Sequence, residues 1–390
     1  MTRALRLVLC VLAALLSAPA LARRSFLPSP LQLHRVPTHL AAVGPSAAVM
    51  SSRQLPVFFF HGVTATESSA FHYAQNLTGE GRVVVALNFC PGRCSVEGLQ
   101  DQVQLAIPMI RGVINANAEL FQHGYIFIGH SQGGALARAV LEHWDEHNVK
   151  FFISLAGAQN GIFFGPQPED QVALQVFMHS LGPQMIPRSL LDFSAYSPGD
   201  LRGKFQFDMS ETMLAHPEGQ AKYSGFNLAR SPDHARWAAA NPFLPVINNV
   251  NPCGPADADC LAAKRRRRDN FLRLEAAHFF ASPEDQVISP WQSSVLAQYS
   301  DVANGSDIET AFEALRIVDM QHTPEYLDDS YGLRSLDARG GLHLHVVPDV
   351  RHSCWVADTP SVVDPKQVCR FAPVYEQHIY PLLQTMVVKQ

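Results

Sequence analysis

The sequence carries little net charge. Its 390 residues include 35 acidic and 30 basic side chains, which give a net charge of −5 at pH 7. Charged residues make up only 17% of the chain. This balance offers no basic surface for nucleic acid, so we expect no nucleic-acid partner. The 47% hydrophobic content excludes a disordered chain and suffices for one large domain, or for one domain with an insertion.

Long apolar runs are also missing beyond the first residues. A helix that crosses a bilayer needs about 20 apolar residues, and we therefore expect no transmembrane segment. Residues 1–22 are typical of a secretory signal peptide, with a basic start, an apolar stretch over 7–16 and small residues at Ala20 and Ala22. A signal anchor is the alternative, but it needs a longer apolar span. We expect a soluble protein in the secretory pathway, in a lysosome-like compartment or outside the cell.

Cysteine is scarce and its spacing does not match that of a zinc site. Removal of the signal peptide takes away Cys10 and leaves six cysteines, without the Cys-x2-Cys pairs or paired histidines typical of zinc. We expect no metal. An even number in an oxidising compartment indicates disulfides, and six cysteines allow 15 connectivities. Proximity favours the local pairs Cys90-Cys94, Cys253-Cys260 and Cys354-Cys369.

Three further surface features agree with a secreted protein. Asn76-Leu-Thr78 and Asn304-Gly-Ser306 are glycosylation sequons. The run Lys264-Arg265-Arg266-Arg267-Arg268 is interpreted first as a solvated basic loop. The alternative is a cleavage site for a protease that cuts after basic residues, because exposed loop tips are where chains are nicked.

Apolar strands alternate with helical patterns through the first part of the chain. This alternation predicts βαβ units and an α/β fold with a mainly parallel sheet. Helical spacing covers residues 69–77 and 96–124. The strand candidates are Leu55–Phe60, Arg82–Leu87, the segment before residue 129, and Phe151–Leu155.

The alternation of strands and helices is absent near the start of the chain and is interrupted in its middle. Residues 23–52, rich in Pro, Ala and Ser, predict a poorly ordered lead-in before an α/β domain over 53–390. An insertion over about 160–270 is expected to form a helical cap above the carboxyl edge of the sheet, where ligands bind in open α/β folds. Strands are expected again at Phe271–Phe280 and at Leu342–Val347, the latter as a half-exposed edge strand, and a helix at 372–388.

Residues 129–133 read Gly-His-Ser-Gln-Gly, centred on Ser131. An apolar strand precedes this Gly-x-Ser-x-Gly pattern and a helical segment follows it. That context is typical of the nucleophile turn of an α/β-hydrolase, where glycines two positions away on either side avoid a clash. Ser131 is therefore the candidate nucleophile.

A serine nucleophile needs a histidine base and an acid that orients the base, in the order Ser, acid, His in this fold. Asp285 follows a late strand and is our choice of acid. His352 follows the last strand, whereas His343 and His345 lie inside that strand and are expected to face outward. The competing acids are Glu284, Asp301, Asp319 and Asp349.

The oxyanion of the reaction needs two backbone donors. One is expected to be the N–H of Gln132, directly after the nucleophile. The other is expected from the loop after the first strand, where His61-Gly62 precedes Val63 and the N–H of Val63 is the candidate. A plain turn is the alternative interpretation of His61-Gly62.

Several segments together resemble the palmitoyl-protein thioesterase family. The serine motif is common among hydrolases, whereas the blocks after Asp285 and after Asp329 are much more specific. The resemblance runs from about residue 54 to the C-terminus and places the family's catalytic residues on Ser131, Asp285 and His352. The matching segments are His61-Gly62, Gly129–Gly134, Asp285–Ser294, Asp329–Gly340, and His352 followed by Trp355.

The resemblance implies hydrolysis of long-chain acyl thioesters, such as S-palmitoylated peptides or acyl-coenzyme A, in the lysosome. No cofactor is expected. A secreted lipase or carboxylesterase acting on oxygen esters is the main alternative, and an inactive hydrolase fold that carries lipid is another. The apolar groove for the acyl chain is expected in the cap, with the candidates Phe163, Phe164, Phe177, Met178 and Met185.

Overall fold

The fold is described from a computed structural model, which covers residues 54–361 and 366–387. The expected signal peptide over residues 1–22 and the expected lead-in over 23–52 lie outside the described residues. The last expected helix, over residues 372–388, ends at residue 388, which also lies outside the described residues.

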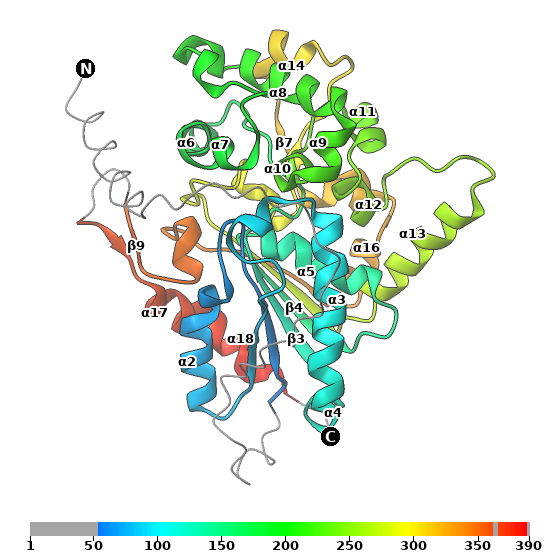
Figure 1. Ribbon diagram of the computed structural model, residues 1–390, viewed down its shortest axis with the longest axis vertical. Coiled ribbons are helices and arrows are strands. Elements are labelled where there is room, and N and C mark those ends of the chain that lie inside the picture. The colour runs from blue at the N-terminus through cyan, green and yellow to red at the C-terminus, as the bar shows by residue number, and fades with distance from the viewer. Residues whose placement is uncertain (1–53, 362–365, 388–390) are drawn as a thin grey trace, which may run out of the picture.

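A six-stranded sheet forms the centre of the molecule (Figure 1). Its strands follow the order β2-β1-β3-β4-β5-β8, and every neighbouring pair is parallel. The α/β-hydrolase fold and the mainly parallel sheet expected from the sequence are confirmed. The strands are β1 (Val57–Phe60), β2 (Val84–Ala86), β3 (Tyr125–His130), β4 (Val149–Leu155), β5 (Ala276–Ala281) and β8 (Leu342–Val346).

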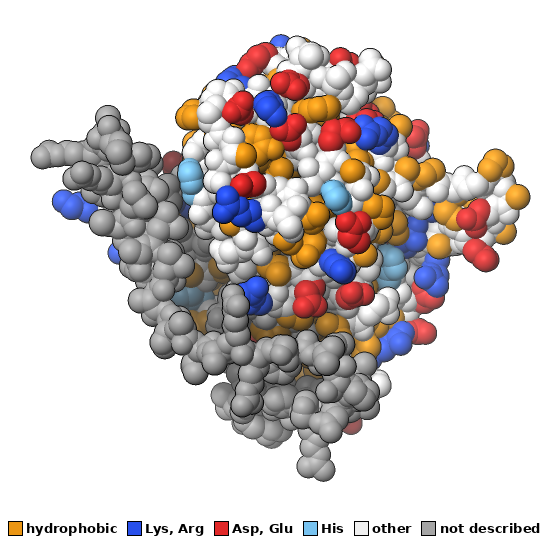
Figure 2. All heavy atoms as spheres, turned by 45° about the horizontal axis from the view of Figure 1, so that its top comes forward, with side chains coloured by type: hydrophobic (Ala, Val, Ile, Leu, Met, Phe, Trp, Pro, Cys, Tyr) orange, Lys and Arg blue, Asp and Glu red, His pale blue; other side chains and the backbone are white. Residues whose placement is uncertain are grey.

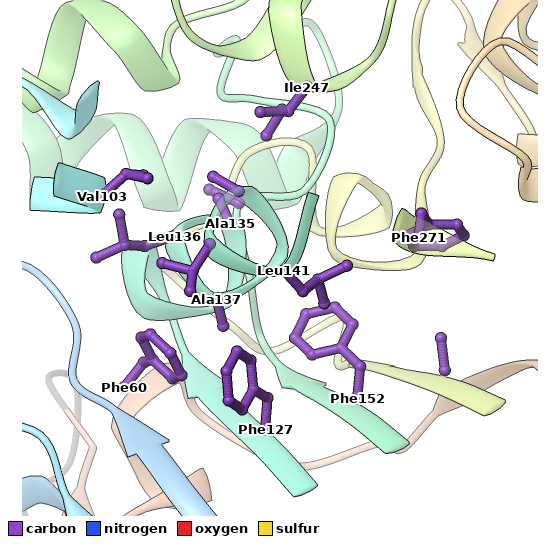
Figure 3. Packing of buried hydrophobic residues seen from close by; sticks show 14 of the residues in the cluster. Phe60, Val103, Phe127, Ala135, Leu136, Ala137, Leu141, Phe152, Ile247 and Phe271 are labelled. Atoms are coloured by element: carbon purple, nitrogen blue, oxygen red, sulfur yellow. The ribbon is translucent and has the colours of Figure 1, made fainter. Parts of the chain in front are cut away.

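Both faces of the sheet are buried, which explains the continuous apolar strands. In β1, Val57 and Phe59 pack on one face, while Phe58 and Phe60 pack on the other. Figure 3 shows Phe60 and its neighbours on β3 and β4, Phe127 and Phe152, pointing toward the helix that follows β3. The nucleophile candidate sits between that strand and that helix, so the core fixes its position.

Helices cover the two faces. One face packs against α3, α5 and α13, and the other against α2, α17 and α18. A π-helical turn, Tyr375–Ile379, joins α17 to α18. The bounds are α2 (Phe71–Gly79), α3 (Leu99–Ala116), α4 (Ala118–Phe121), α5 (Gln132–His143), α13 (Ala258–Phe271), α17 (Phe371–Val374) and α18 (Tyr380–Thr385).

Helices α6 to α12 lie between β4 and β5 in the chain and sit over the carboxyl end of the sheet (Figure 1). We refer to residues 160–250 of this region as the cap. Most of its helices are short. They are α6 (Pro168–Val176), α7 (Gly182–Met185), α8 (Lys204–Ala215), α9 (Pro217–Lys222), α10 (Ser224–Leu228), α11 (His234–Ala240) and α12 (Leu244–Ile247).

The remaining elements are small and follow β5. Two short antiparallel pairs form, one between β6 and β7 and one between β9 and β10. Acidic and basic side chains are interspersed on the face in Figure 2. The bounds are β6 (Gln298–Tyr299), β7 (Ile317–Val318), β9 (Thr359–Pro360), β10 (Val368–Cys369), α14 (Asp307–Thr310), α15 (Pro324–Leu327) and α16 (Leu333–Ala338).

Two sequence predictions around residue 270 were wrong. The basic run Lys264–Arg268 is not a loop, because it lies inside α13. Arg267 is only 5% exposed and donates to Asn249, and Arg268 pairs with Asp329 at 2.6 Å. The cleavage hypothesis required an exposed loop tip, and these residues do not form one. The strand predicted at Phe271–Phe280 begins only at Ala276, since Phe271 still belongs to the helix.

The edge strand β8 also differs from its expected orientation. His343 and His345 are half-buried, because their rings stack on His278 of β5 at 4.5 and 5.4 Å. The exposed side chains of this strand are Leu344 and Val346. The two histidines therefore pack against the sheet instead of facing outward.

The cysteines form the three local pairs favoured by proximity. The structure links Cys90 to Cys94, Cys253 to Cys260 and Cys354 to Cys369. Within residues 54–361 and 366–387, no helix is long and apolar enough to cross a bilayer. Asn76 and Asn304 are both exposed, and their glycosylation stays a prediction.

Arg82 joins the end of the chain to the start of the sheet, and this contact is testable. Its guanidinium is 1% exposed and donates to the carbonyls of Leu55 at 2.9 Å and Leu383 at 2.7 Å. Replacement Arg82→Leu removes both hydrogen bonds, and the carbonyl of Leu383 then keeps only the N–H of Met386 at 3.2 Å. We expect the free energy of unfolding to fall by about 3 kcal/mol, measured by urea denaturation.

The matched control is Arg111→Leu. Arg111 pairs with the carboxylate of Glu146, and both side chains are largely exposed. Exposed pairs contribute little, so the control should change stability by less than about 1 kcal/mol. Equal losses in the two variants would contradict the role given to Arg82.

Asp170 connects α6 of the cap to the segment after β5 through hydrogen bonds. It is 1% exposed and accepts hydrogen bonds from the hydroxyls of Tyr299 and Ser289, the latter at 2.7 Å. Burial raises the pKa of Asp170 to about 6, from 3.8. Between these values the folded protein holds a proton that the unfolded chain releases, so this group stabilises the fold at low pH.

We therefore expect the free energy of unfolding to fall by about 2 to 3 kcal/mol between pH 4 and pH 7 because of Asp170 alone. Asp170→Asn should remove this part of the pH dependence, measured by denaturation at several pH values. Glu169→Gln, at an exposed position of the same helix, is the control and should leave it in place. The same pH slope in wild type and Asp170→Asn would refute the assignment.

Candidate active site

Ser131 stands on a sharp turn between β3 and α5. Its φ of 58° and ψ of −131° lie in a region that residues with side chains rarely occupy. Its N–H donates to the carbonyl of Leu155 on β4 at 3.0 Å, which anchors the turn to the sheet. The side chain is 6% exposed. This is the geometry of a strained nucleophile turn at the end of a strand.

Three glycines allow the main chain to come this close. A Cβ on Gly129 would overlap the main chain of Gly133, and a Cβ on Gly133 would overlap the carbonyls of residues 60 and 61. A Cβ on Gly62 would lie 3.0 Å from the Cβ of Ser131. The loop after β1 therefore lies directly against the serine, as the pattern of glycines in the sequence predicts.

Asp285 and His352 contact each other directly. The imidazole Nδ1 of His352 lies 2.9 and 3.0 Å from the two carboxylate oxygens of Asp285. The main-chain N–H of His352 also donates to the carbonyl of Asp285 at 3.0 Å. Because a carboxylate only accepts, Nδ1 carries the proton and Nε2 of a neutral ring is left free to accept one. Both residues are more than nine-tenths buried.

The carboxylate of Asp285 is itself held by its own turn. Its Oδ1 accepts from the N–H groups of Val287 at 3.0 Å and Ile288 at 2.7 Å. The competing acids are engaged elsewhere: Glu284 accepts from the N–H of Asp349, and Asp301 faces His234 at 4.0 Å. The structure brings Asp285, and none of these competitors, to His352.

His130 was not predicted as a site residue, although it stands next to the nucleophile in the motif. Its Nε2–H donates to the main-chain carbonyl of His352 at 2.8 Å, and the two rings lie 4.9 Å apart. Burial lowers the pKa of His130 to about 3. His130 therefore stays neutral in acid and adds no charge beside His352.

Gln132 and Val63 lie on two segments that Ser95 connects. The side chain of Gln132 donates to the carbonyl of Ser95 at 2.7 Å, and the hydroxyl of Ser95 accepts from the N–H of Thr64 at 2.6 Å. Gln132 is the first residue of α5, where main-chain N–H groups have no partner within the helix. Ser95 follows the Cys90–Cys94 disulfide directly, and sequence reasoning missed it.

A narrow apolar pocket of about 30 Å³ opens at Ser131, and we name it the serine pocket. The expected oxyanion donors Val63 and Gln132 line it, together with two of the acyl-chain candidates, Phe177 and Met185. Sequence reasoning missed other walls, which come from the segment after β4, from the cap and from the turn after Asp285. They are Ala158, Ile162, Leu181, Met209, Gly225, Leu228, Ala229, Val287 and Ile288.

Three of the five residues expected to bind the acyl chain do not line the serine pocket. Phe164 is 1% exposed and packs on Phe177 at 4.9 Å in the core of the cap. Phe163 packs on Tyr299 at 5.6 Å. Met178 lines a different hollow of the cap. In the described part of the chain, no group of three or more His, Cys, Asp or Glu residues could hold a metal ion.

Comparison with known proteins agrees with this geometry. A family model described as palmitoyl protein thioesterase matches residues 56–352. The lysosomal thioesterase PPT2 of Rattus norvegicus is 33% identical over 303 residues, which cover 77% of this chain and 82% of the rat protein. The human PPT2 is 32% identical with the same coverage. A PPT2 homologue of Drosophila melanogaster is 26% identical and covers 80% of this chain and 90% of the fly protein.

The match spans the strand before Ser131, the cap and the turn of Asp285, and it ends at His352. It therefore includes every residue of the site described above. The chain belongs to the palmitoyl protein thioesterase family and is an enzyme of the α/β-hydrolase fold.

Proposed function

We propose that Ser131, His352 and Asp285 form a catalytic triad that hydrolyses long-chain acyl thioesters. The observation that carries the proposal is the contact between His352 and Asp285, which places the proton of a neutral His352 ring on Nδ1. A base in this tautomer accepts the proton of a serine hydroxyl. Asp285 keeps the imidazole oriented and stabilises the imidazolium that forms.

In the first half of the reaction, Oγ of Ser131 attacks the thioester carbonyl while its proton moves to His352. The N–H groups of Val63 and Gln132 are proposed to stabilise the resulting oxyanion. The C–S bond then breaks, and the departing thiolate takes the proton from His352. A thiol of pKa about 8.5 leaves readily, which reduces the demand for a strong general acid.

In the second half, a water attacks the acyl-serine. His352 accepts the proton of this water, a second tetrahedral oxyanion forms at the same two N–H groups, and the C–O bond to Ser131 breaks. The proton returns to Ser131, and the fatty acid leaves. The net reaction consumes one water and yields a thiol and a carboxylic acid, without a cofactor.

Two observations support an acyl thioester as the substrate and a lysosome-like compartment as the location. The serine pocket has apolar walls, including Phe177 and Met185, and apolar walls suit a fatty chain. The relatives named above are lysosomal thioesterases, and the three disulfides fit an oxidising compartment. We propose S-acylated peptides or acyl-coenzyme A as substrates.

The test compares palmitoyl-coenzyme A with a palmitoyl oxygen ester. We expect a higher kcat/KM for the thioester, and a clear preference for the oxygen ester would favour a lipase or carboxylesterase instead. Ser131→Ala and Asp285→Asn should each lower kcat by about a thousandfold or more, because one removes the nucleophile and the other leaves the base in the wrong tautomer. Unchanged turnover in Ser131→Ala would exclude this mechanism.

The control for the aspartate is Glu284→Gln, at the neighbouring carboxylate. Glu284 accepts hydrogen bonds from the hydroxyl of Ser282 and from the N–H of Asp349. Among the described residues, no hydrogen bond joins Glu284 to His352. Its replacement should leave kcat within a few-fold of wild type. A loss as large as that of Asp285→Asn would show that the acid has been assigned to the wrong residue.

His130 should act by positioning His352. His130→Phe keeps the ring but removes the donor to the carbonyl of His352, and we expect kcat to fall by about tenfold, as for the loss of one hydrogen bond. His130→Gln places an amide N–H near the position of Nε2 and should recover most of the rate. The measurement is kcat from pH 4 to pH 8.

Because His130 is already neutral above a pKa of about 3, neither variant should shift the acidic limb of the pH profile. A shifted limb in His130→Phe would indicate that His130 itself takes up a proton in the reaction. Full activity in His130→Phe together with a loss in His130→Gln would indicate that the ring shape, and not the hydrogen bond, holds His352.

A further inference from the structure

A short turn closed by a disulfide packs on the loop that follows β1. The loop comprises residues 61–65, and we name it the β1 loop. The turn is a 3-10 segment, Gly92–Val96, which overlaps the Cys90–Cys94 disulfide. We name residues 90–96 the disulfide turn. The N–H of Gly92 donates to the carbonyl of Ala65 at 2.7 Å, so the disulfide turn contacts the β1 loop directly.

Hydrogen bonds fix the peptide between Gly62 and Val63 within the β1 loop. The carbonyl of Gly62 accepts from the Nδ1–H of His61 at 2.9 Å and from the N–H of Ala65 at 3.3 Å. This peptide is trans, so its N–H points away from its carbonyl. The direction of the Val63 N–H, one of the two proposed oxyanion donors, is therefore set by the bonds on the opposite side of the peptide.

The hydroxyl of Ser95 holds the next residue of the β1 loop. It accepts from the N–H of Thr64 at 2.6 Å and donates to the carbonyl of Gly92 at 2.6 Å. Thr64 has a φ of 57°, in the left-handed region that a β-branched residue rarely adopts. Such a conformation persists only where the surroundings hold it. Ser95 supplies this hold from a fully buried side chain.

The carbonyl of Ser95 holds the segment that carries the other proposed donor. It accepts from the side-chain amides of Gln132 at 2.7 Å and of Gln102 at 3.0 Å. Gln102 belongs to α3 and also donates to the carbonyl of Glu97 at 2.8 Å, which ties the disulfide turn to that helix. One buried residue therefore contacts both segments that carry the proposed oxyanion donors.

The distances in such a site control its effect. Donors stabilise an oxyanion when they lie about 2.7 to 3.1 Å from it, and a misplacement of about 1 Å can cost about a hundredfold in rate. The oxyanion forms only during the reaction. Groups that hold its donors in place therefore affect the chemical step more than the binding of the substrate.

We propose that Ser95 is a positioning residue that fixes the two oxyanion donors, Val63 and Gln132, relative to each other, and that the Cys90–Cys94 disulfide holds Ser95 for this task. The proposal rests on the thioesterase function proposed above and adds to it a determinant of the rate. Loss of the contacts of Ser95 lowers kcat and leaves KM nearly unchanged.

The first test is Ser95→Ala, which removes the hydroxyl and keeps the carbonyl. Thr64 is exposed, so water can replace the lost acceptor and the variant should fold. We expect kcat for palmitoyl-coenzyme A to fall about tenfold, because the donor of Val63 is displaced and not removed. KM should stay within about twofold of the wild-type value.

The matched control is Thr323→Val, at the residue that caps α15. Thr323 is also fully buried, and its hydroxyl donates to the carbonyl of Met320 at 2.7 Å and accepts from the N–H of Tyr326 at 3.3 Å. The urea midpoints of the two variants should fall to a similar extent, whereas kcat should fall in Ser95→Ala alone. An unchanged kcat in Ser95→Ala, or an equal fall in both variants, would overturn the proposal.

The carbonyl contact is tested by Gln132→Met. This change removes the side-chain amide that donates to Ser95 and keeps the main-chain N–H of residue 132. We expect kcat to fall about tenfold with KM again nearly unchanged. Wild-type kcat in this variant would show that Ser95 does not position the second donor.

An inhibitor that forms an oxyanion tests the positioning without turnover. Oγ of Ser131 adds to the carbonyl carbon of a palmityl trifluoromethyl ketone, its proton passes to His352, and the ketone oxygen becomes the oxyanion. The inhibition constant should rise in Ser95→Ala by about the factor by which kcat/KM falls. The matched methyl ketone, which scarcely forms this adduct, should bind both proteins equally. Equal inhibition by the trifluoromethyl ketone would overturn the proposal.

The role of the disulfide is tested with the double variant Cys90→Ala, Cys94→Ala. The control is Cys253→Ala, Cys260→Ala, which removes another local disulfide, at α13. Both bridges close short loops, so their loss costs little chain entropy and both variants should fold. We expect kcat to fall several-fold in the first variant and to stay at the wild-type value in the control.

Two outcomes separate this proposal from the proposed function. Wild-type kcat without the Cys90–Cys94 bridge would overturn the role given to the disulfide, while the thioesterase function would stand. Absence of Ser131-dependent thioester turnover in the wild type would instead overturn the proposed function.

Discussion

The site depends on the strained main chain at Ser131. A residue with a side chain in this conformation costs about 1 to 3 kcal/mol, which the surrounding structure must offset. The hydrogen bond to Leu155 anchors the turn to β4, and the absent side chains of Gly129 and Gly133 let α5 and the end of β1 close around it. The buried sheet and α5 thus hold Ser131 in this strained conformation.

The turn after β5 combines two roles in a few residues. The N–H groups of Val287 and Ile288 bind the carboxylate of Asp285, and the same two residues line the serine pocket. Ser289, the next residue, bonds to Asp170 of the cap. One segment therefore holds the carboxylate that contacts His352, lines the serine pocket and bonds to the cap. These combined contacts give a physical reason why the sequence after Asp285 is specific to the family.

Local pattern predicted those parts of the fold that local pattern determines. The sequence predicted the apolar strands and the glycines around Ser131, and it suggested the order Ser131, Asp285, His352. Each of these features belongs to one strand and the loop that follows it. The start of β5 was misplaced because apolar Phe271 also suits the last turn of a helix. The burial of Arg267 and the pocket walls supplied by α8 and α10 arise from contacts distant in sequence, which no local period records.

The sheet therefore positions the candidate catalytic residues, whereas the cap shapes the hollows beside them. The three candidate catalytic residues follow strands of one parallel sheet, so hydrogen bonding between strands sets their relative positions. The cap has short helices, and buried amides such as Asn241 and Gln206 tie its segments together through main-chain carbonyls. A substitution in the cap can reshape the hollows beside Ser131 without moving the sheet. Chains that share these three candidate residues can consequently differ in the shape of the hollows beside them.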